Sequence, residues 1–366
     1  MIATLTLAAI LLAQQAGPLD ALLARHGDAI RRAKTYDELA AAAKSTLAEL
    51  TKLIESPPDA ESAARARAIA CDILGDLGDF AGAEHQARKF LETWPKHEQV
   101  ALVKMQLGQV LLSAGRDADA RDAFQAVVRD HAGDPRAFEA KLRTAQTYVC
   151  EKKDEDAIKA FTALRAEYKG KPEEWAIVMQ QALALQIGGK VGEGRALLEE
   201  TVRTCKDART VGFAKNILTN WLWIGKMVRP IEGYDLKGGP VKLDLAGGKV
   251  TILYFLGAAF PDFEAESGVM RKLSKLFKPE DVSLLAVAID KDKAKLESDL
   301  ARAGVTWPVA FDGNGFKGPI ASSYSIDSLP MVLIVDRRNT IRFVNPVFSD
   351  HAREIQRCVE ALVNEK

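Results

Sequence analysis

Cysteine and histidine are scarce in this sequence, and they show none of the spacings that are typical of a metal site. The 366 residues include five histidines and four cysteines, at positions 71, 150, 205 and 358. No two cysteines form a Cys-x-x-Cys pair, and the histidines show no metal-ligand spacing. We therefore expect neither a zinc site nor another metal site, and we expect no cofactor.

An excess of charge of one sign is also absent. Lys and Arg together number 50, as do Asp and Glu, and residues 230–366 are as balanced as the residues before them. A nucleic-acid surface or a polybasic membrane-binding face would concentrate basic residues. We therefore expect no nucleic-acid partner.

The sequence begins with an uncharged apolar run that is too short to cross a bilayer. Ile2 to Ala13 spans 12 residues, whereas a transmembrane helix needs about 20. No Lys or Arg precedes the run, and small and polar residues follow it before Gly17. The pattern predicts a secretory signal peptide over residues 1–16, with an uncleaved N-terminal helix as the alternative. No cysteine follows to carry a lipid anchor. We expect export to a periplasm, without stable membrane insertion after cleavage.

A repeat with a period of 37 residues extends from about residue 64 to residue 207. The phrases GDFAGA, GRDADA, KKDEDA and GKVGEG end at residues 83, 120, 157 and 194. Twelve residues before each of these ends stands a small residue: Cys71, Gly108, Ala145 and Ala182. Nine residues before it stands a large apolar residue: Leu74, Leu111, Tyr148 and Leu185. Small residues let two helices approach, and bulky residues lock one pair onto the next. The period therefore predicts four pairs of antiparallel helices.

These pairs resemble the tetratricopeptide repeat, which has small residues at its eighth and twentieth positions and an aromatic residue at its twenty-fourth. The period departs from the usual 34 residues, which implies slightly longer helices or turns. Residues 20–33 and 37–56 are predicted to form a divergent first pair. Residues 210–228 predict one more helix, without a second partner, that caps the solenoid. Trp221 and Trp223 are expected to pack in this cap.

In the resembled family, the first helix of each pair lines an inner, concave wall. Here that wall is apolar and lacks the Lys/Asn/Arg cluster that would clamp a peptide carboxylate. Its residues are Leu102, Met105, Leu112, Leu142, Val149, Met179, Leu183 and Ile187. Two interpretations stay open. Another part of the chain covers the wall, since large exposed apolar patches are rare, or the wall is a groove that binds a partner segment.

The repeat register also bears on the cysteines, because an exported chain could form disulfides. It places Cys150 near the end of one repeat's first helix and Cys205 near the end of the next repeat's second helix. These ends lie roughly 20 Å apart for helices of about 13 residues. A disulfide needs Cα atoms within about 7 Å. We therefore predict four free thiols.

After Pro230 the pattern changes to alternating strands and helices. Strands are predicted in VKLDLAGG, KVTILYFLG, VSLLAVAID, PVAF, SLPMVLIVD and TIRFVN, from their apolar runs and alternation. Helices are predicted at about 264–277, 291–303, 316–324 and 350–364. Such alternation is typical of a mostly parallel sheet with helices on both faces.

This layout resembles TlpA-like thiol–disulfide oxidoreductases and their redoxin relatives, over about residues 230–366. GGKVTILYFLGAAFPDFEAES lies on that family's strand, its Trp-Cys-Pro-Pro-Cys turn and the following helix. Ala259 then occupies the tryptophan position, and Phe260 and Phe263 occupy the two cysteine positions. Between them, Pro261 is kept and Asp262 follows it, and Glu266 matches a common acidic position. DSLPMVLIVD matches the family's cis-proline segment, which implies a cis peptide bond before Pro330.

The missing thiols decide what this domain can do. Disulfide exchange needs an attacking thiolate and a second sulfur, and phenylalanine supplies neither. The one thiol after residue 230 is Cys358, and its apolar neighbours predict that it is packed in the last helix. The resemblance still implies a surface at the turn and the cis-proline that accepts an extended peptide. Phe260 and Phe263 either anchor a partner side chain there or turn inward and fill space, and the sequence favours neither.

Together these patterns predict an α solenoid of tetratricopeptide type followed by an α/β thioredoxin-like domain. The predicted boundaries are 1–16 for the signal peptide, 20–228 for the repeats, 229–248 for a linker and β-hairpin entry, and 249–366 for the thioredoxin-like domain. The predicted function is an exported, redox-inactive adaptor or scaffold that binds a protein or peptide, with no catalytic residues. The alternative is a thiol–disulfide oxidoreductase or redoxin-type enzyme that uses a non-standard site. The sequence leaves the oligomeric state open.

Overall fold

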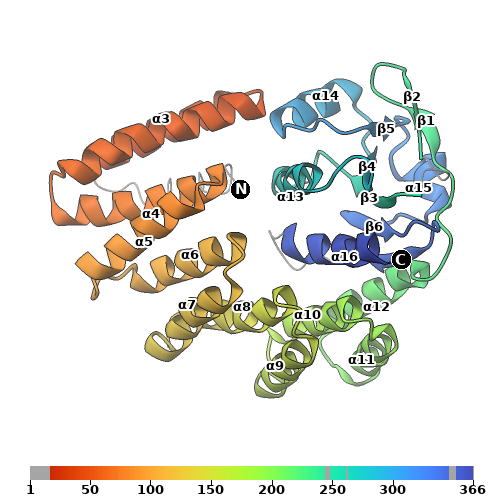
Figure 1. Cartoon of the computed structure of the whole chain (residues 1–366), viewed down its shortest axis with the longest axis horizontal. Helices are drawn as coiled ribbons and strands as arrows, with labels where there is room; N and C mark the ends of the chain where they lie inside the picture. The colour runs from red at the N-terminus through yellow and green to blue at the C-terminus, as the bar shows by residue number, and fades with distance from the viewer. Residues whose placement is uncertain (1–16, 244–247, 261–262, 346–351, 366) are drawn as a thin grey trace. The chain divides into compact units, whose positions relative to one another are not determined.

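The computed structural model describes residues 17–243, 248–260, 263–345 and 352–365 (Figure 1). The predicted signal peptide and the predicted site residues Pro261 and Asp262 lie outside the described residues. The chain divides into two compact units, residues 1–151 and residues 152–366. Each unit is described by itself.

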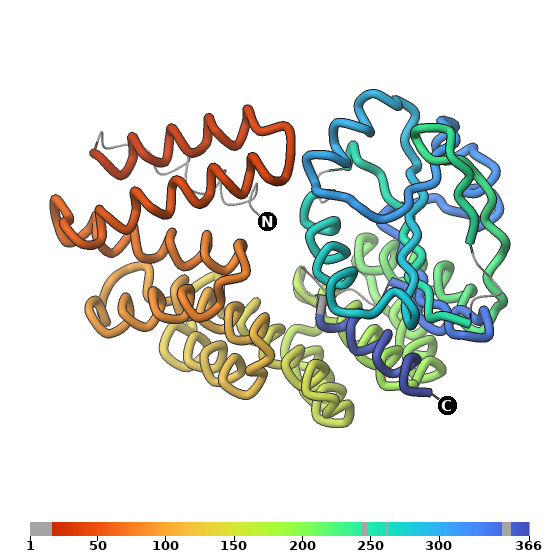
Figure 2. The backbone as a smooth tube through the Cα atoms, turned by 45° about the horizontal axis from the view of Figure 1, so that its top comes forward, coloured from red at the N-terminus to blue at the C-terminus, as the bar shows by residue number. Residues whose placement is uncertain are grey.

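The first unit is built from helices that pack in succession and run antiparallel to their neighbours (Figure 2). Its helices are α2 (Pro18–Arg32), α3 (Tyr36–Glu55), α4 (Ala60–Leu77), α5 (Phe80–Thr93), α6 (Val100–Ser113), α7 (Asp117–Asp130) and α8 (Arg136–Cys150). The second unit begins with α9 (Asp154–Glu167), α10 (Glu174–Ile187), α11 (Val191–Thr204) and α12 (Ala208–Asn220). The predicted helical solenoid is confirmed.

The 37-residue period of the sequence is also the period of the helices. The second helices of the four pairs begin at residues 80, 117, 154 and 191. The turn before each of them contains a residue with positive φ: Gly78, Gly115, Lys152 and Gly189. A left-handed residue at this place ends a helix and reverses the chain. The repeated turn therefore sets the spacing of the pairs.

The predicted small residues lie where helices meet. Cys71, Gly108, Ala145 and Ala182 are all buried. At Gly108 a Cβ atom would lie only 2.4 Å from Cε1 of Phe124, on the partner helix α7. Phe124 is fully buried, so its ring fills the space that the glycine leaves open.

A five-stranded sheet forms the centre of the second unit, in the order β5-β4-β3-β6-β7. Its strands are β3 (Val250–Leu256), β4 (Val282–Ala288), β5 (Val309–Phe311), β6 (Met331–Val335) and β7 (Ile341–Val344). β3, β4 and β5 are parallel, while β6 and β7 pair antiparallel. All seven residues of β3 are buried, as expected for a central strand covered on both faces. β1 (Glu232–Tyr234) and β2 (Pro240–Lys242) form a separate hairpin.

Helices cover both faces of this sheet. On one face Tyr254 reaches α13 (Phe263–Leu276), which packs beside α16 (Ala352–Asn364). On the other face the ring of Phe255 lies 5.1 Å from that of Tyr324, just after α15 (Pro319–Ser323). α14 (Lys293–Arg302) joins β4 to β5, and η2 (Gly315–Lys317) precedes α15. The predicted α/β layout with helices on both faces is confirmed. The prediction of a mostly parallel sheet is wrong, because β6 pairs antiparallel with both β3 and β7 and makes the sheet mixed.

The last helices of the solenoid share one hydrophobic core with this sheet. Leu183 of α10, Leu198 of α11 and Trp221 belong to the same buried cluster as Phe255 and Leu333. Between α16 and α9, Arg357 Nη2 donates to both carboxylate oxygens of Asp154, at 2.6 and 2.7 Å. The predicted boundary at residue 228 therefore marks a change of sequence pattern, and the hydrophobic core continues across it.

The capping helix is shorter than the predicted 210–228. α12 ends at Asn220, and Trp221–Trp223 form the 3₁₀ turn η1. Both indoles are buried, as predicted. Residues 225–228 then run along the edge strand β7, where Ile341 N donates to Lys226 O at 2.9 Å and Val228 N donates to Asn339 O at 2.8 Å. Burying the indoles and pairing with β7 outweigh continuing the helix.

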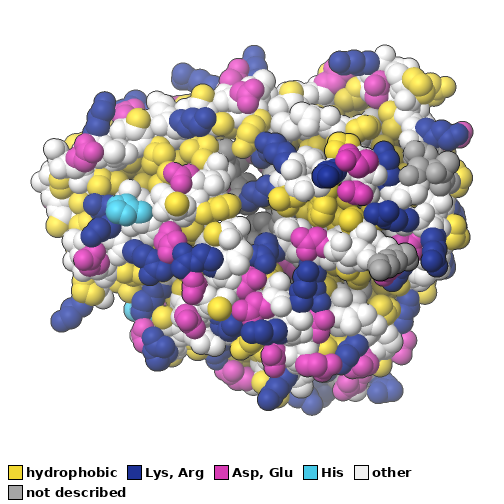
Figure 3. All heavy atoms as spheres, viewed as in Figure 1, with side chains coloured by type: hydrophobic (Ala, Val, Ile, Leu, Met, Phe, Trp, Pro, Cys, Tyr) yellow, Lys and Arg dark blue, Asp and Glu magenta, His cyan; other side chains and the backbone are white. Residues whose placement is uncertain are grey.

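On the face drawn in Figure 3, basic and acidic side chains alternate over the helices and the α/β domain, with apolar side chains between them. No helix within the described ranges is both long and apolar enough to span a membrane.

Candidate ligand-binding site beside the cis-proline

The turn after β3 is held by a carboxylate and by a glycine. Asp290, which follows β4, accepts a hydrogen bond from Ala258 N at 3.1 Å, and burial raises the pKa of this carboxyl group. A Cβ atom on Gly257 would lie 2.6 Å from the ring of Phe260 and 2.7 Å from Cδ1 of Leu329. Only glycine lets both side chains lie over this point. The turn therefore places Phe260 beside Leu329.

The two phenylalanines at the cysteine positions have different surroundings. Phe260 is 44% exposed, whereas Phe263 is 3% exposed at the start of α13. Phe263 N donates to Phe260 O at 3.2 Å, so a backbone hydrogen bond links the exposed residue to the buried one. The Phe260 ring therefore keeps surface that is open to solvent, and the Phe263 ring is packed in the core.

The Leu329–Pro330 peptide bond is cis, as the resemblance implies. Beside it, Val332 N donates to Asn345 Oδ1 at 2.6 Å, and Asn345 N donates to Val332 O at 2.7 Å. These two bonds, between Val332 of β6 and Asn345 just after β7, are the last in the pairing of the two strands. In the part of the chain that the structure describes, the N–H and C=O groups of Leu329 and the C=O of Pro330 make no hydrogen bond. This loop therefore offers main-chain groups to a ligand.

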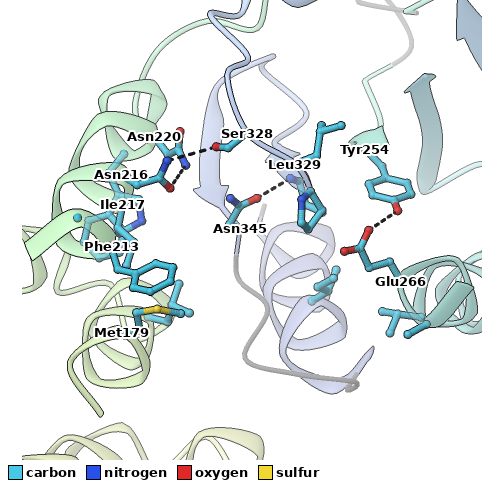
Figure 4. Close-up of a pocket in the computed structure, with 18 of the residues that line it drawn as sticks. Met179, Phe213, Asn216, Ile217, Asn220, Tyr254, Glu266, Ser328, Leu329 and Asn345 are labelled. Atoms are coloured by element: carbon cyan, nitrogen blue, oxygen red, sulfur yellow. Dashed lines mark hydrogen bonds between the residues drawn. The ribbon is translucent and has the colours of Figure 1, made fainter. Parts of the chain in front are cut away.

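A cavity of about 710 Å³ lies between this loop and the end of the solenoid (Figure 4). α10 and α12 form one wall, and the cis-proline loop, α13 and α16 form the other. Most of its lining is apolar, including Met179, Leu183, Phe213, Ile217, Val269 and Met270. Volumes of this size are common for sites that bind small molecules or side chains.

Polar groups are placed at a few points around this apolar lining (Figure 4). Asn216 Nδ2 donates to Ser328 Oγ at 3.2 Å and joins α12 to the loop. Across the cavity, Tyr254 OH donates to Glu266 Oε2 at 2.7 Å. Burial, followed by the nearby Glu266 charge, raises the pKa of Tyr254. Tyr254 therefore stays a neutral donor at physiological pH.

Arg209 stands at the α12 side of the cavity on an aromatic stack. Its guanidinium carbon lies 4.8 Å from the ring centre of Trp175, and this ring stacks on Phe213 at 4.9 Å. Among the residues that the structure describes, no carboxylate lies within ion-pair distance of the Arg209 guanidinium, and its charge acts on nearby Asp207 only as one of the smaller causes that lower the pKa of that carboxyl group. A guanidinium in a cation–π contact can still use its N–H groups for hydrogen bonds.

The structure brings together only part of the predicted concave wall. Met179 and Leu183 line the cavity. Leu102 and Met105 keep some exposed surface, while Leu112, Leu142, Val149 and Ile187 are buried. The sequence interpretation missed the lining from α12. Phe213 and Ile217, four residues apart on the predicted capping helix, were the signal that could have indicated it.

The described cysteines are poorly placed for thiol–disulfide exchange. Cys358 is 1% exposed, and burial raises the pKa of its thiol, so the reactive thiolate is disfavoured. Cys71 and Cys150 are buried and Cys205 is partly exposed. Across the described ranges, no three His, Cys, Asp or Glu residues lie close enough to hold a metal ion.

Comparison with known protein families agrees with this architecture. Residues 224–344 match the AhpC/TSA family. The C-terminal domain is thioredoxin-like. Residues 71–135 and 105–149 match the tetratricopeptide repeat, so the helix pairs within these residues are repeats of this type.

Similar proteins carry names of thiol–disulfide oxidoreductases. The protein ResA of Geobacillus kaustophilus is 28% identical over 108 residues, which are 30% of this chain and 60% of ResA. ResA of Halalkalibacterium halodurans is 28% identical over 29% of this chain and 59% of its own. The chain thus spans about three fifths of these relatives.

Solved structures of thioredoxin-like domains are also similar to this chain. The thioredoxin domain of a thiol–disulfide oxidoreductase from Bacteroides vulgatus has 23% identity and a TM-score of 0.35, and the match covers 38% of this chain and 98% of that domain. An oxidoreductase from Bacteroides fragilis has 17% identity and a TM-score of 0.31, over 32% of this chain and 89% of its own.

Proposed function

We propose that this protein is an exported, redox-inactive adaptor that binds protein partners through its repeats and through the surface at the cis-proline. The observation that carries the proposal is the pair Phe260 and Phe263 at the two cysteine positions, one exposed and one buried. Neither side chain can attack a disulfide. The fold therefore keeps a ligand-facing loop without the chemistry that the names of its relatives describe.

Further support comes from the repeats and from the N-terminal residues. Tetratricopeptide repeats stack into extended surfaces that suit protein partners. The apolar run of residues 2–13, which small and polar residues follow, fits a signal peptide. Cell fractionation against a periplasmic marker tests export, and recovery of the chain only with cytoplasmic markers would contradict it.

An insulin-reduction assay on the purified full chain tests redox inactivity. We expect insulin to be reduced at the rate given by dithiothreitol alone, whether or not the protein is present. Activity that survives Cys358→Ser would show a catalytic group outside the thiols and would overturn the proposal.

The same assay gains strength from restoring the cysteines. In the double variant Phe260→Cys/Phe263→Cys, the N-terminus of α13 should lower the pKa of the first thiol, so reductase activity should appear. Phe260→Cys alone is the matched control, because it lacks the resolving sulfur. Circular dichroism should confirm that the double variant is folded, since Phe263 is buried. Equal activity in both variants would contradict this account of the turn.

Photocrosslinking tests the binding half of the proposal. Benzoylphenylalanine placed at Phe260 should form an adduct with a partner in periplasmic extract. Leu276 is the matched control, because it is 54% exposed and lies at the far end of α13, roughly 20 Å away for 14 residues of helix. Adducts of equal yield at both positions, or none at Phe260, would count against a ligand-facing surface at the turn.

A further inference from the structure

We propose that the cavity between α12 and the cis-proline loop binds an extended peptide segment that carries an apolar and an acidic side chain two residues apart, on the same face of the segment. The solenoid wall, rather than the thioredoxin-like domain alone, sets this selectivity. The inference rests on the proposed function and names the partner chemistry of the same surface.

The apolar requirement follows from the lining. Met179, Phe213 and Ile217 project from α10 and α12 toward the loop, as Figure 4 shows. Phe213 keeps 37% of its surface exposed, although it lies beside an apolar space. An apolar side chain that enters the cavity removes this surface from water, which is favourable in proportion to the area buried.

The main-chain requirement follows from the cis-proline loop. The N–H and C=O of Leu329 and the C=O of Pro330 lack a hydrogen-bond partner among the described residues. Such groups are nearly always paired when they are covered. An extended peptide can pair with both a donor and an acceptor there, whereas a hydrocarbon tail can pair with neither. A peptide therefore fits this loop better than a lipid does.

The acidic requirement follows from Arg209. The aromatic stack of Trp175 and Phe213 orients the guanidinium. The nearest acidic residue in sequence, Asp207, accepts from Thr210 N and Thr210 Oγ, both at 2.7 Å, as the cap of α12. These bonds, and to a smaller extent the charge of Arg209, lower the pKa of Asp207. An arginine fork matches a carboxylate with two parallel hydrogen bonds. A carboxylate of the bound segment completes this site.

Blocked synthetic peptides are the probes. Alternate residues of an extended chain point the same way, so the test peptide is acetyl-Gly-Ser-Leu-Ser-Glu-Ser-Gly-amide, with a second peptide in which Leu and Glu exchange places. Replacing Glu by Gln or Lys, or Leu by Ser, gives the matched controls. The blocked ends leave the Glu side chain as the sole carboxylate, and a Gln peptide with a free C-terminus tests the other source. Titration calorimetry on the full chain measures Kd.

Two glycines provide a blocking variant and its control. Gly212 lines the cavity, and a Cβ atom there would meet nothing within 4 Å. Gly212→Leu should therefore fill the cavity without strain and weaken binding of the Leu–Glu peptide at least tenfold. Gly192 on α11 is equally open and lies outside the lining. Gly192→Leu should leave Kd unchanged, and thermal melts should show both variants folded.

The acidic preference has its own pair of variants. Because Arg209 is exposed, we expect the Glu peptide to bind about two- to fivefold more tightly than the Gln peptide. Arg209→Gln should abolish this ratio, whereas Arg203→Gln, on an exposed part of α11, should preserve it. A ratio that Arg209→Gln leaves unchanged would overturn the acidic requirement.

The remaining outcomes separate this inference from the proposed function. If no peptide binds, or if Gly212→Leu binds as well as the wild type, the cavity is not the peptide site. Binding of dodecanoate that Gly212→Leu abolishes, in the absence of peptide binding, would assign the cavity to an amphipathic lipid instead. The adaptor role depends on the insulin assay and on crosslinking at Phe260. Adducts that persist in Gly212→Leu would keep that role while rejecting the cavity.

Discussion

Replacing Gly108 by alanine tests a close helix–helix contact of the solenoid. The new Cβ atom would lie 2.4 Å from Cε1 of Phe124, whereas carbon atoms prefer a separation of about 3.5–4.0 Å. One of the two helices must therefore shift by about 1 Å. The Phe124 ring has no exposed surface, so it cannot swing into solvent to relieve the clash.

The expected magnitude combines two opposing effects. Overpacking a core usually lowers the free energy of unfolding by about 1–3 kcal/mol. Exchanging glycine for alanine within a helix raises it by up to about 1 kcal/mol. We expect Gly108→Ala to lower the free energy of unfolding by about 1–2 kcal/mol. Gly75→Ala is the matched control in the same unit, because its Cβ atom would lie at an ordinary 3.6 Å from Val110. Gly75→Ala should raise the free energy of unfolding by about 0.5–1 kcal/mol.

Urea unfolding followed by far-ultraviolet circular dichroism measures both variants. A double-mutant cycle with Phe124→Leu then isolates the contact, and the coupling between positions 108 and 124 should be about 1 kcal/mol or more. If Gly108→Ala were stabilised as much as Gly75→Ala, or if the cycle showed no coupling, the repeat register would be wrong.

Three further outcomes are expected. Ellman's reagent should react quickly with Cys205, since the other three cysteines are buried, and with four thiols after unfolding, whereas two would reveal a disulfide. Gln186→Leu should lower the free energy of unfolding in urea by about 2–4 kcal/mol, because it leaves Val344 N–H and C=O without their partners at 2.8 and 3.0 Å. An unchanged midpoint would refute that assignment. Burial and the charge of Asp76 raise the pKa of Asp72 to about 7, above the value of about 3.9 expected in the unfolded chain. The folded state therefore holds this proton more tightly, and stability falls as pH rises from about 4 to 7. Asp72→Asn should raise Tm more at pH 8 than at pH 4.5, and an equal shift at both values would contradict this.

The sequence was sufficient where structure depends on local pattern. The 37-residue spacing predicted the helix pairs, because a small residue and a bulky one recur at fixed distances from each turn. The strand and the loop around Pro330 were also predictable, since apolar runs and a proline at a fixed place mark them. These features do not depend on which distant residues come into contact.

The candidate site needed the structure because it joins distant segments. Asn216 contacts Ser328, and nothing in either segment indicates the other. The same holds for Phe260 and Phe263, because the direction of a side chain on a tight turn depends on the φ and ψ angles of the turn. The end of α12 at Asn220 was unpredictable for a related reason, since Trp221 packs on Gly194, where a Cβ atom would lie 2.8 Å from the indole.

The backbone that follows η1 has a consequence for dividing this protein into fragments. Residues 225–228 and Gln186 satisfy hydrogen bonds along β7, the outer strand of the sheet. A fragment that starts at residue 229, where the helical pattern stops, would leave this strand open and ready to pair with another copy. We expect such a fragment to self-associate. A fragment that starts at residue 152, by contrast, keeps the strand covered and is the better choice for study in isolation.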